Sequence, residues 1–313
     1  MQKGYKLLDA HSHKEALKVG QRLGKLRHSS TFEIMALAYQ QAGKPSKAIA
    51  ILETGISKAG RVWLLWELLG NFYSDAGRFE EAERVYQQAL LREGCNLDVV
   101  HLNRAIAFNR AGKPLAALAA IEGVNSKRLF RRVQACLIRI KLLVEKKREA
   151  LRLASKLFKL RHFAGENYDE ETESEILLAC ALAFSHSPKT RLKARRLALR
   201  AIDWNPSSQE ALAIIRSTAP ESVAMPLLFR CLVRGAWNAP IGRSRIPPGF
   251  FRSFVVAASG KEEILEYLKP FFPSSIRPSL SIEETERLSS TDAIRPGVYS
   301  VSGRMFFPLR KPK

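Results

Sequence analysis

The strongest constraint on this chain is a two-helix pattern that returns about every 34 residues. The pattern is clearest in residues 63–96, which read WLLWELLGNFYSDAGRFEEAERVYQQALLREGCN. The first half has four residues at helical spacing: Trp66, Leu69, Gly70 and Tyr73. The second half, which follows a turn around Gly77, has three more: Ala82, Tyr86 and Ala89. Spacings of three and four residues predict two amphipathic helices joined by a short turn.

The small residues of this pattern predict where the two helices cross. Antiparallel helices approach closely only where a small side chain lies at the crossing, and Gly70 and Ala82 occupy those positions. We expect larger residues such as Trp66 and Tyr86 to fill the surrounding space at the usual interior density. Ala89 is predicted to face the next pair of helices.

The same pattern occurs on both sides of this unit. In residues 29–62 it recurs at an offset of 34, with three matching residues: Tyr39, Gly43 and Ala48. In residues 98–131 it recurs at an offset of 35, with four matching residues: Phe108, Gly112, Ala117 and Ile121. The glycine of each unit is predicted to end the first helix in a left-handed conformation.

The run W-x2-L-G-x2-Y followed by A-x3-Y resembles the tetratricopeptide repeat (TPR) family. The resemblance is strong for residues 29–131 and weaker for residues 2–26 and 132–207. It implies an all-α fold in which helix pairs stack into a right-handed α-α superhelix, a TPR-like solenoid. It also implies a concave groove, lined by the first helix of each pair, that holds a partner protein or peptide.

Proline usage predicts where the solenoid ends. Eleven of the fifteen prolines lie after residue 218. We therefore predict a helical solenoid over residues 1–218, whose last helix begins near Ser207 or Ser208, and an irregular, Pro-rich C-terminal cap over residues 219–313. Within the cap we expect two helices and a short β-hairpin, at residues 221–234, 261–269 and around Ser302-Gly303.

The composition is that of an ordinary folded protein, since 46% of the residues are hydrophobic and 26% are charged. No apolar run approaches the roughly 18 residues of a membrane span, and the N-terminus lacks the apolar region of a secretory signal. We therefore expect a cytoplasmic protein with no membrane span.

The cysteines form no C-x-x-C pair and are expected to be buried thiols: Cys95, Cys136, Cys180 and Cys231.

The net charge of +21 is concentrated in one part of the chain. Residues 1–100 carry 14 basic and 11 acidic residues, whereas residues 101–161 carry 16 basic and 3 acidic residues. Four of the cations lie on one stripe of a predicted helix, and two more come from a later helix: Arg148, Arg152, Lys156 and Lys159, then Arg195 and Arg196. This set is a candidate anion surface for RNA or another polyanion. The alternative is a solvated basic face that binds nothing.

No catalytic or cofactor motif stands out in the sequence. The chain has no Gly-rich phosphate loop, no G-x-S-x-G and no H-E-x-x-H. Adjacent acidic pairs such as Glu283-Glu284 lie in helix-like segments, where solvated positions explain them. A catalytic C-terminal cap is disfavoured because no histidine follows His186. We therefore predict no catalytic residue, no metal site and no cofactor, and a protein that is not an enzyme.

Five residues are predicted to line the partner groove that the resemblance implies: Glu67, Asn71, Asn103, Arg110 and Arg132. One TPR subclass grips an acidic C-terminus with Asn, Lys and Arg side chains, and Asn71, Asn103 and Arg132 fall near matching positions. Glu67 departs from that pattern because it lies where the clamp has a lysine, and it would repel a terminal carboxylate. The alternatives are that the two asparagines bind partner backbone or that water alone solvates them.

Two functions remain in view. The first is a non-catalytic TPR scaffold or adaptor that binds an unidentified partner protein or peptide in its concave groove. The second is nucleic-acid or ribosome association through the basic helices at residues 127–200. The sequence names no partner and sets no oligomeric state.

Overall fold

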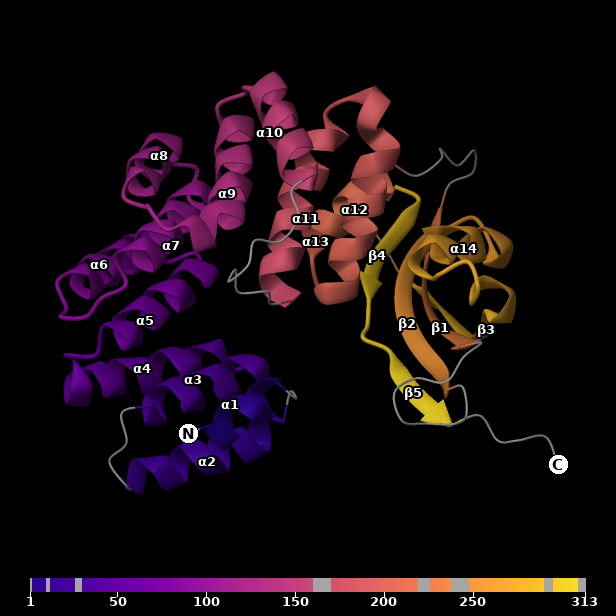
Figure 1. The fold of residues 1–313 in the computed structure, drawn as a ribbon. Helices are drawn as coiled ribbons and strands as arrows, with labels where there is room; N and C mark the ends of the chain where they lie inside the picture. The colour runs from indigo at the N-terminus through magenta and orange to yellow at the C-terminus, as the bar shows by residue number, and fades with distance from the viewer. Residues whose placement is uncertain are drawn as a thin grey trace. The chain divides into compact units, whose positions relative to one another are not determined.

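A computed structural model describes residues 2–9, 12–25, 30–159, 170–218, 226–237, 248–289 and 295–308. The chain forms two compact units, Met1–Glu145 and Lys146–Lys313. Unit 1 is helical where it is described, whereas unit 2 combines helices with a β-sheet (Figure 1). No helix in the described ranges is both long enough and apolar enough to cross a bilayer.

Unit 1 consists of helices that pack in sequential pairs, as the sequence predicts. Contacts join α1 to α2, α3 to α4, α5 to α6 and α7 to α8. The helices are α1 (Gln2–Asp9), α2 (His13–Lys25), α3 (Thr31–Gln41), α4 (Pro45–Ala59), α5 (Trp63–Asp75), α6 (Phe79–Leu90), α7 (Leu97–Arg110), α8 (Pro114–Glu122) and α9 (Phe130–Leu143).

Three glycines shape the turns between these helices. Gly43, Gly77 and Gly112 have φ angles of 67°, 74° and 69°, the left-handed conformation that side chains disfavour. The residue after each glycine donates its backbone N–H to a carbonyl of the preceding helix, as in the 2.8 Å bond from Arg78 N to Tyr73 O. This is the Schellman arrangement, and it confirms the predicted role of the three glycines.

The helix crossing of the 63–96 unit lies where the small residues predict it. A Cβ atom added to Gly70 would lie 2.4 Å from Cε1 of Tyr86, so the α6 ring rests directly on the α5 backbone. Ala82 and Ala89 are fully buried, and Tyr86 is almost so. The apolar seam continues to the preceding and following units, since Leu52 and Val100 belong to the same core cluster.

Unit 2 begins with helices that pack around α11. Contacts join α11 to α10, α12 and α13, and α12 also contacts α13. Ser208 caps α13, as predicted, because its side chain accepts a hydrogen bond from Ala211 N at 3.3 Å. The helices are α10 (Lys147–Lys159), α11 (Glu170–Ser185), α12 (Arg191–Trp204), α13 (Gln209–Ser217) and α14 (Lys261–Leu268).

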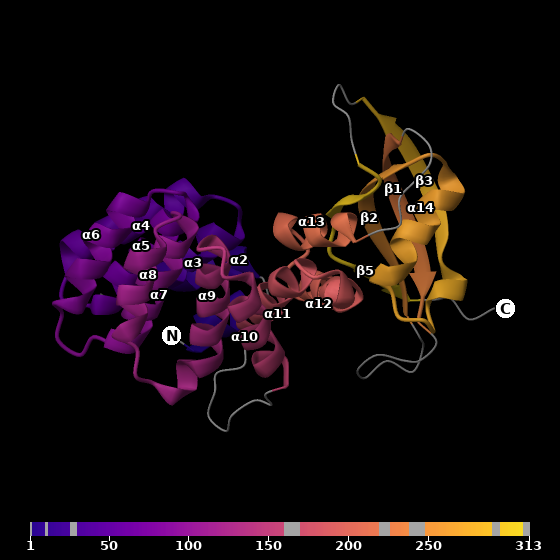
Figure 2. The same cartoon turned by 90° about the horizontal axis from the view of Figure 1, so that it is seen from above.

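An antiparallel sheet follows these helices in unit 2. Its strand order is β3-β1-β2-β4, and β5 also pairs with β2. Strands β1, β2, β3 and β5 can be followed in Figure 2. The strands are β1 (Leu227–Ala236), β2 (Pro248–Ala258), β3 (Ser281–Leu288), β4 (Gly297–Val301) and β5 (Met305–Pro308).

Aromatic side chains form the core between the sheet and α14. Phe250 stacks on Phe272 with ring centroids 5.4 Å apart, and Phe254 meets the edges of Phe271 and Phe272. The helix α14 packs against β2 and β4, and α13 also packs against β4. The sheet therefore has a close-packed hydrophobic core rather than an irregular surface.

The predicted helix at residues 221–234 is wrong. Residues 219–225 lie outside the described part of the chain, and Leu227–Ala236 is strand β1. Along β1 the exposed Arg230 and Arg234 alternate with buried residues such as Val233, which is the two-residue period of a strand. The sequence alone misleads here because a short apolar run fits a helix and a strand equally well.

Two further expectations for the cap need correction, while the helix at 261–269 is confirmed as α14. Glu283 and Glu284 lie in strand β3 rather than in a helix. The two segments that flank Ser302-Gly303 are strands, but they pair with β2 instead of with each other. The long strand β2 offers more ladder hydrogen bonds than two short strands offer each other.

The boundary between the two compact units lies between Glu145 and Lys146, whereas the predicted domain boundary lies between residues 218 and 219. Unit 2 contains α10–α13 as well as the sheet, because α13 packs directly on β4. Arg216 of α13 strengthens this contact by donating to Val298 O at 2.8 Å. The predicted boundary coincides with the change from helices to strands.

Gly70→Ala should destabilise unit 1 by about 1–3 kcal/mol, the usual cost of overpacking. The added methyl group has no space, because the Tyr86 ring occupies its position. Chemical denaturation of the purified chain measures the change in the free energy of unfolding.

A double-mutant cycle identifies the ring as the cause. In a Tyr86→Leu background the added cost of Gly70→Ala should shrink, because the rigid ring is gone, whereas Tyr86→Phe should leave it unchanged. An equal cost in all three backgrounds would contradict this account of the crossing.

Candidate functional site

The first helices of successive pairs in unit 1 lie side by side. Contacts join α3 to α5, α5 to α7 and α7 to α9, although each pair of neighbours is separated in sequence by a second helix (Figure 1). These helices carry the five residues that the sequence predicts for the partner groove. We call the surface formed by α3, α5, α7 and α9 the first-helix face.

Three of the five predicted groove residues meet in one hydrogen-bonded network. Glu67 is only 6% exposed, and its Oε1 accepts hydrogen bonds from Asn71 Nδ2 at 2.7 Å and from Asn103 Nδ2. Tyr86 donates its hydroxyl proton to Asn71 Oδ1 at 2.7 Å. The network thereby joins α5, α6 and α7. Sequence reasoning missed the polar role of Tyr86, because its spacing marks it only as a packing residue.

Burial controls the ionisation of Glu67. Loss of hydration raises the pKa of its carboxyl group, whereas the amides of Asn71 and Asn103 and the positive charge of Arg132 lower it. The negative charge of Glu33, on the neighbouring helix α3, adds to the upward shift. Burial also raises the pKa of Glu33, which accepts a 2.6 Å hydrogen bond from the Tyr5 hydroxyl.

The two predicted arginines occupy different places. Arg132 lies half-buried on α9, close enough to Glu67 to act on it electrostatically. Arg110 is exposed at the end of α7, where its Nη1 pairs with Asp75 Oδ1 of α5 at 2.5 Å. Arg110 therefore joins two first helices at their C-terminal ends and does not belong to the Glu67 network.

The network determines what this face offers a ligand. An ionised Glu67 gives the floor of the face a negative charge, so a terminal carboxylate would meet repulsion there. The side-chain amides of Asn71 and Asn103 already donate to Glu67. The arrangement suits a polar or cationic partner group better than an anionic one.

The predicted anion surface lies in unit 2, on α10 and α12. Arg148, Arg152, Lys156 and Lys159 are all exposed on α10. None of these four side chains forms an ion pair with another residue in the described ranges.

The cations of α12 differ from one another. Arg196 is exposed, but Arg195 is half-buried and donates to Thr218 O at 3.1 Å, at the end of α13. Lys193 Nζ lies 4.1 Å from the ring centroids of both Phe158 and Phe184. Two of these three cations thus stabilise the packing of unit 2, so the exposed basic surface is smaller than the sequence suggests.

The described residues contain no cluster of three or more His, Cys, Asp or Glu side chains arranged to hold a metal ion. None of the four cysteines forms a disulfide with another described residue, and three of them are buried. Burial raises the pKa of the Cys231 thiol to about 11, which keeps it protonated and unreactive.

A family comparison identifies the hairpin that carries the network. Residues 65–94 match the sequence profile of the tetratricopeptide repeat. This hairpin is therefore similar to a tetratricopeptide repeat. The TPR match spans most of α5 and all of α6, and so includes Glu67, Asn71 and Tyr86. No curated protein matches the sequence.

Several solved structures are similar to this chain. The C-terminal part of a TPR repeat-containing protein from Cytophaga hutchinsonii is 16% identical over 71% of this chain and 96% of that chain, with a TM-score of 0.44. PilF from Pseudomonas aeruginosa is 16% identical over 67% and 92%, with a TM-score of 0.46. A TPR protein from Parabacteroides merdae is 11% identical over 69% and 96%, with a TM-score of 0.44.

Glu67→Gln should reduce the pH dependence of stability. Because burial raises the pKa of Glu67 in the folded chain, its contribution to stability is complete below the ordinary glutamate pKa of about 4.3. That contribution is lost as the pH rises through the raised pKa. Glutamine keeps an oxygen for both asparagine amides but does not titrate. We expect the variant to lose less stability than the natural chain between about pH 4.3 and 7, as denaturation at several pH values will measure.

Glu93→Gln is the matched control, because Glu93 is exposed in the same unit and the charge change is identical. Its stability profile should follow that of the natural chain. If Glu67→Gln also followed it, burial of the Glu67 carboxylate would not govern the pH dependence.

Proposed function

We propose that this protein is a non-catalytic TPR scaffold that binds a partner protein or peptide on the first-helix face of unit 1. TPR repeats generally mediate protein–protein interactions, and residues 65–94 match that repeat. The observation that carries the proposal is the Glu67 network, which places a buried carboxylate among the first helices.

The energetics of the network favour a binding role over a purely structural one. A buried carboxylate loses hydration that its hydrogen bonds only partly replace, so the position costs folding free energy. An apolar side chain of similar size would join α5 and α7 without that cost. A carboxylate at this place instead supplies charge and fixed hydrogen-bonding geometry to a bound segment.

Local charge indicates the chemistry of that segment. Glu33 and Glu67 lie on neighbouring first helices, and each is partly deprived of water. A lysine or arginine side chain from a partner would relieve the repulsion between these two carboxylates. The proposed partner therefore presents a basic segment to this face, rather than an acidic C-terminus.

Glu33→Gln combined with Glu67→Gln should weaken partner binding about tenfold or more, because the charge complementarity is lost while side-chain shape is kept. A partner captured by affinity purification, then purified, allows the dissociation constant to be measured for each form. The control is Glu93→Gln with Glu122→Gln, two exposed residues of the same unit. Equal affinities for both double variants would reject the first-helix face as the binding site.

A second candidate function is binding to RNA or another polyanion through α10. Four exposed cations favour it, none of which has an ion pair with another residue in the described part of the chain: Arg148, Arg152, Lys156 and Lys159. Their spacing places them along one side of the helix, where a phosphate backbone can contact several at once. In this reading the scaffold brings its partner to a nucleic acid.

Neutralising these four residues to glutamine should lower retention on RNA at about 150 mM salt, and should reduce the slope of log affinity against log salt by about 3. The control removes four exposed cations from unit 1: Lys44, Lys47, Lys58 and Arg61. Equal losses in the two variants would show that net charge alone, and not the α10 surface, determines retention.

A further inference from the structure

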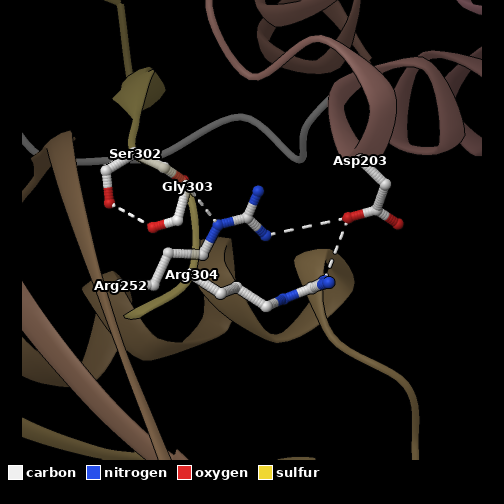
Figure 3. A network of polar contacts seen from close by, with 5 residues as sticks. All are labelled: Asp203, Arg252, Ser302, Gly303 and Arg304. Carbon is white, nitrogen blue, oxygen red and sulfur yellow. Dashed lines mark hydrogen bonds and ion pairs between the residues drawn. The ribbon is translucent and has the colours of Figure 1, made fainter. Parts of the chain in front are cut away.

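A second polar cluster lies in unit 2, where α12, β2 and the segment before β5 come together (Figure 3). Two arginines point at one carboxylate. Arg304 Nη2 lies 3.0 Å and Arg252 Nη1 lies 3.8 Å from the same Oδ1 atom of Asp203. Arg252 also donates through Nε to Ser302 O at 2.9 Å, so its guanidinium group is held in place.

Three buried N–H donors of this cluster have no hydrogen-bond acceptor among the described residues. They are Arg252 Nη1, Arg304 Nε and Trp237 Nε1. Trp237 belongs to the cluster because the guanidinium carbon of Arg304 lies 6.0 Å from the centroid of its ring. The 3.8 Å separation between Arg252 and Asp203 is an ion pair but is too long for a hydrogen bond. Buried donors are nearly always paired in folded proteins, so three in one place indicate a missing acceptor.

The charges of the cluster also call for an acceptor that is negative. Two guanidinium groups share one carboxylate, which leaves one positive charge without a counter-charge among the described residues. Arg252 is only 2% exposed. Burial, together with the positive charge of Arg304, lowers the pKa of Arg252 to about 10.

One side of the cluster is open to solvent. The side chains of Asp203 and Arg304 are 49% and 23% exposed, while Arg252 forms the floor. Arg304 is held there by its ion pair with Asp203 and by the Trp237 ring. The cluster therefore reaches the surface at Asp203 and Arg304, and a small ligand would approach it from that side.

We propose that Arg252, Arg304 and Trp237 form a binding site for a small tetrahedral oxyanion such as inorganic phosphate. The oxyanion supplies several acceptor oxygens at once, as three unpaired donors in one cluster require. Guanidinium groups bind such oxyanions through strong charge-assisted hydrogen bonds. Asp203 opposes the anion and keeps the two arginines paired when the site is empty. This site is separate from the first-helix face and from the α10 cations.

The test is a titration of the purified chain with inorganic phosphate at constant ionic strength, by calorimetry and by thermal unfolding. The natural chain should bind phosphate with one-site stoichiometry. Arg304→Gln should weaken binding about tenfold or more, because one charge-assisted hydrogen bond is lost. Arg287→Gln is the matched control, since Arg287 is exposed on β3 of the same unit and should leave binding unchanged.

Asp203→Asn separates an anion site from a purely structural ion-pair cluster. Without phosphate the variant should unfold at a lower temperature than the natural chain, because the two arginines lose their shared partner. Phosphate should restore its stability, and its affinity should be about tenfold higher than that of the natural chain because the opposing charge is gone. A purely structural cluster predicts the lower stability but no rescue by phosphate.

Trp237→Phe provides a variant that keeps the aromatic ring but removes the N–H donor, so folding is disturbed least. It should bind phosphate more weakly than the natural chain. Sulfate should compete for the site, and glycerol 3-phosphate should show whether an esterified phosphate also fits. The proposal is rejected if the natural chain binds no phosphate. It is also rejected if phosphate changes the unfolding temperature of the natural chain and of every variant no more than chloride does at the same ionic strength.

Discussion

The contact between Gly70 and the Tyr86 ring is the interaction on which the organisation of unit 1 depends. Because Gly70 has no side chain, the ring of α6 rests on the backbone of α5, and the two helices approach closely along an apolar seam. Fully buried alanines recur in the neighbouring helix pairs. Glycines in the left-handed conformation then reverse the chain after each first helix. These two features bring first helices next to one another although they are far apart in sequence.

Tyr86 links this packing to the proposed binding face. Its ring fills the space beside Gly70, while its hydroxyl donates to Asn71, which in turn donates to Glu67. The geometry of the buried carboxylate therefore rests on the same residue that determines the helix crossing. This arrangement holds the polar groups of the first-helix face in fixed positions before any partner binds, and a fixed site loses less entropy on binding.

Basic residues that look alike in the sequence have different environments in unit 2. The cations of α10 are solvated and free of ion pairs in the described ranges, whereas Arg195 and Lys193 of α12 bind a helix end and two aromatic rings.

The strand β1 was predicted as a helix because its apolar run is short, and its partners β2 and β3 lie 12 and 45 residues further along the chain. Such long-range pairing leaves little local trace in a sequence. The Asp203–Arg252–Arg304 cluster also escaped prediction, because its members are separated by 49 and 52 residues and follow no motif.

The sequence by itself determined the helix pairs of residues 29–131, the glycines at their turns and the residues at the crossing of α5 and α6. It could do so because each depends on spacing within one helix or one turn, which local sequence encodes directly. Only the tertiary structure decided that Glu67 is buried between two asparagines, that the cap is a sheet, and that two arginines converge on Asp203. Burial, strand pairing and shared counter-charges arise between segments distant in sequence, and they exist only once those segments have been packed together.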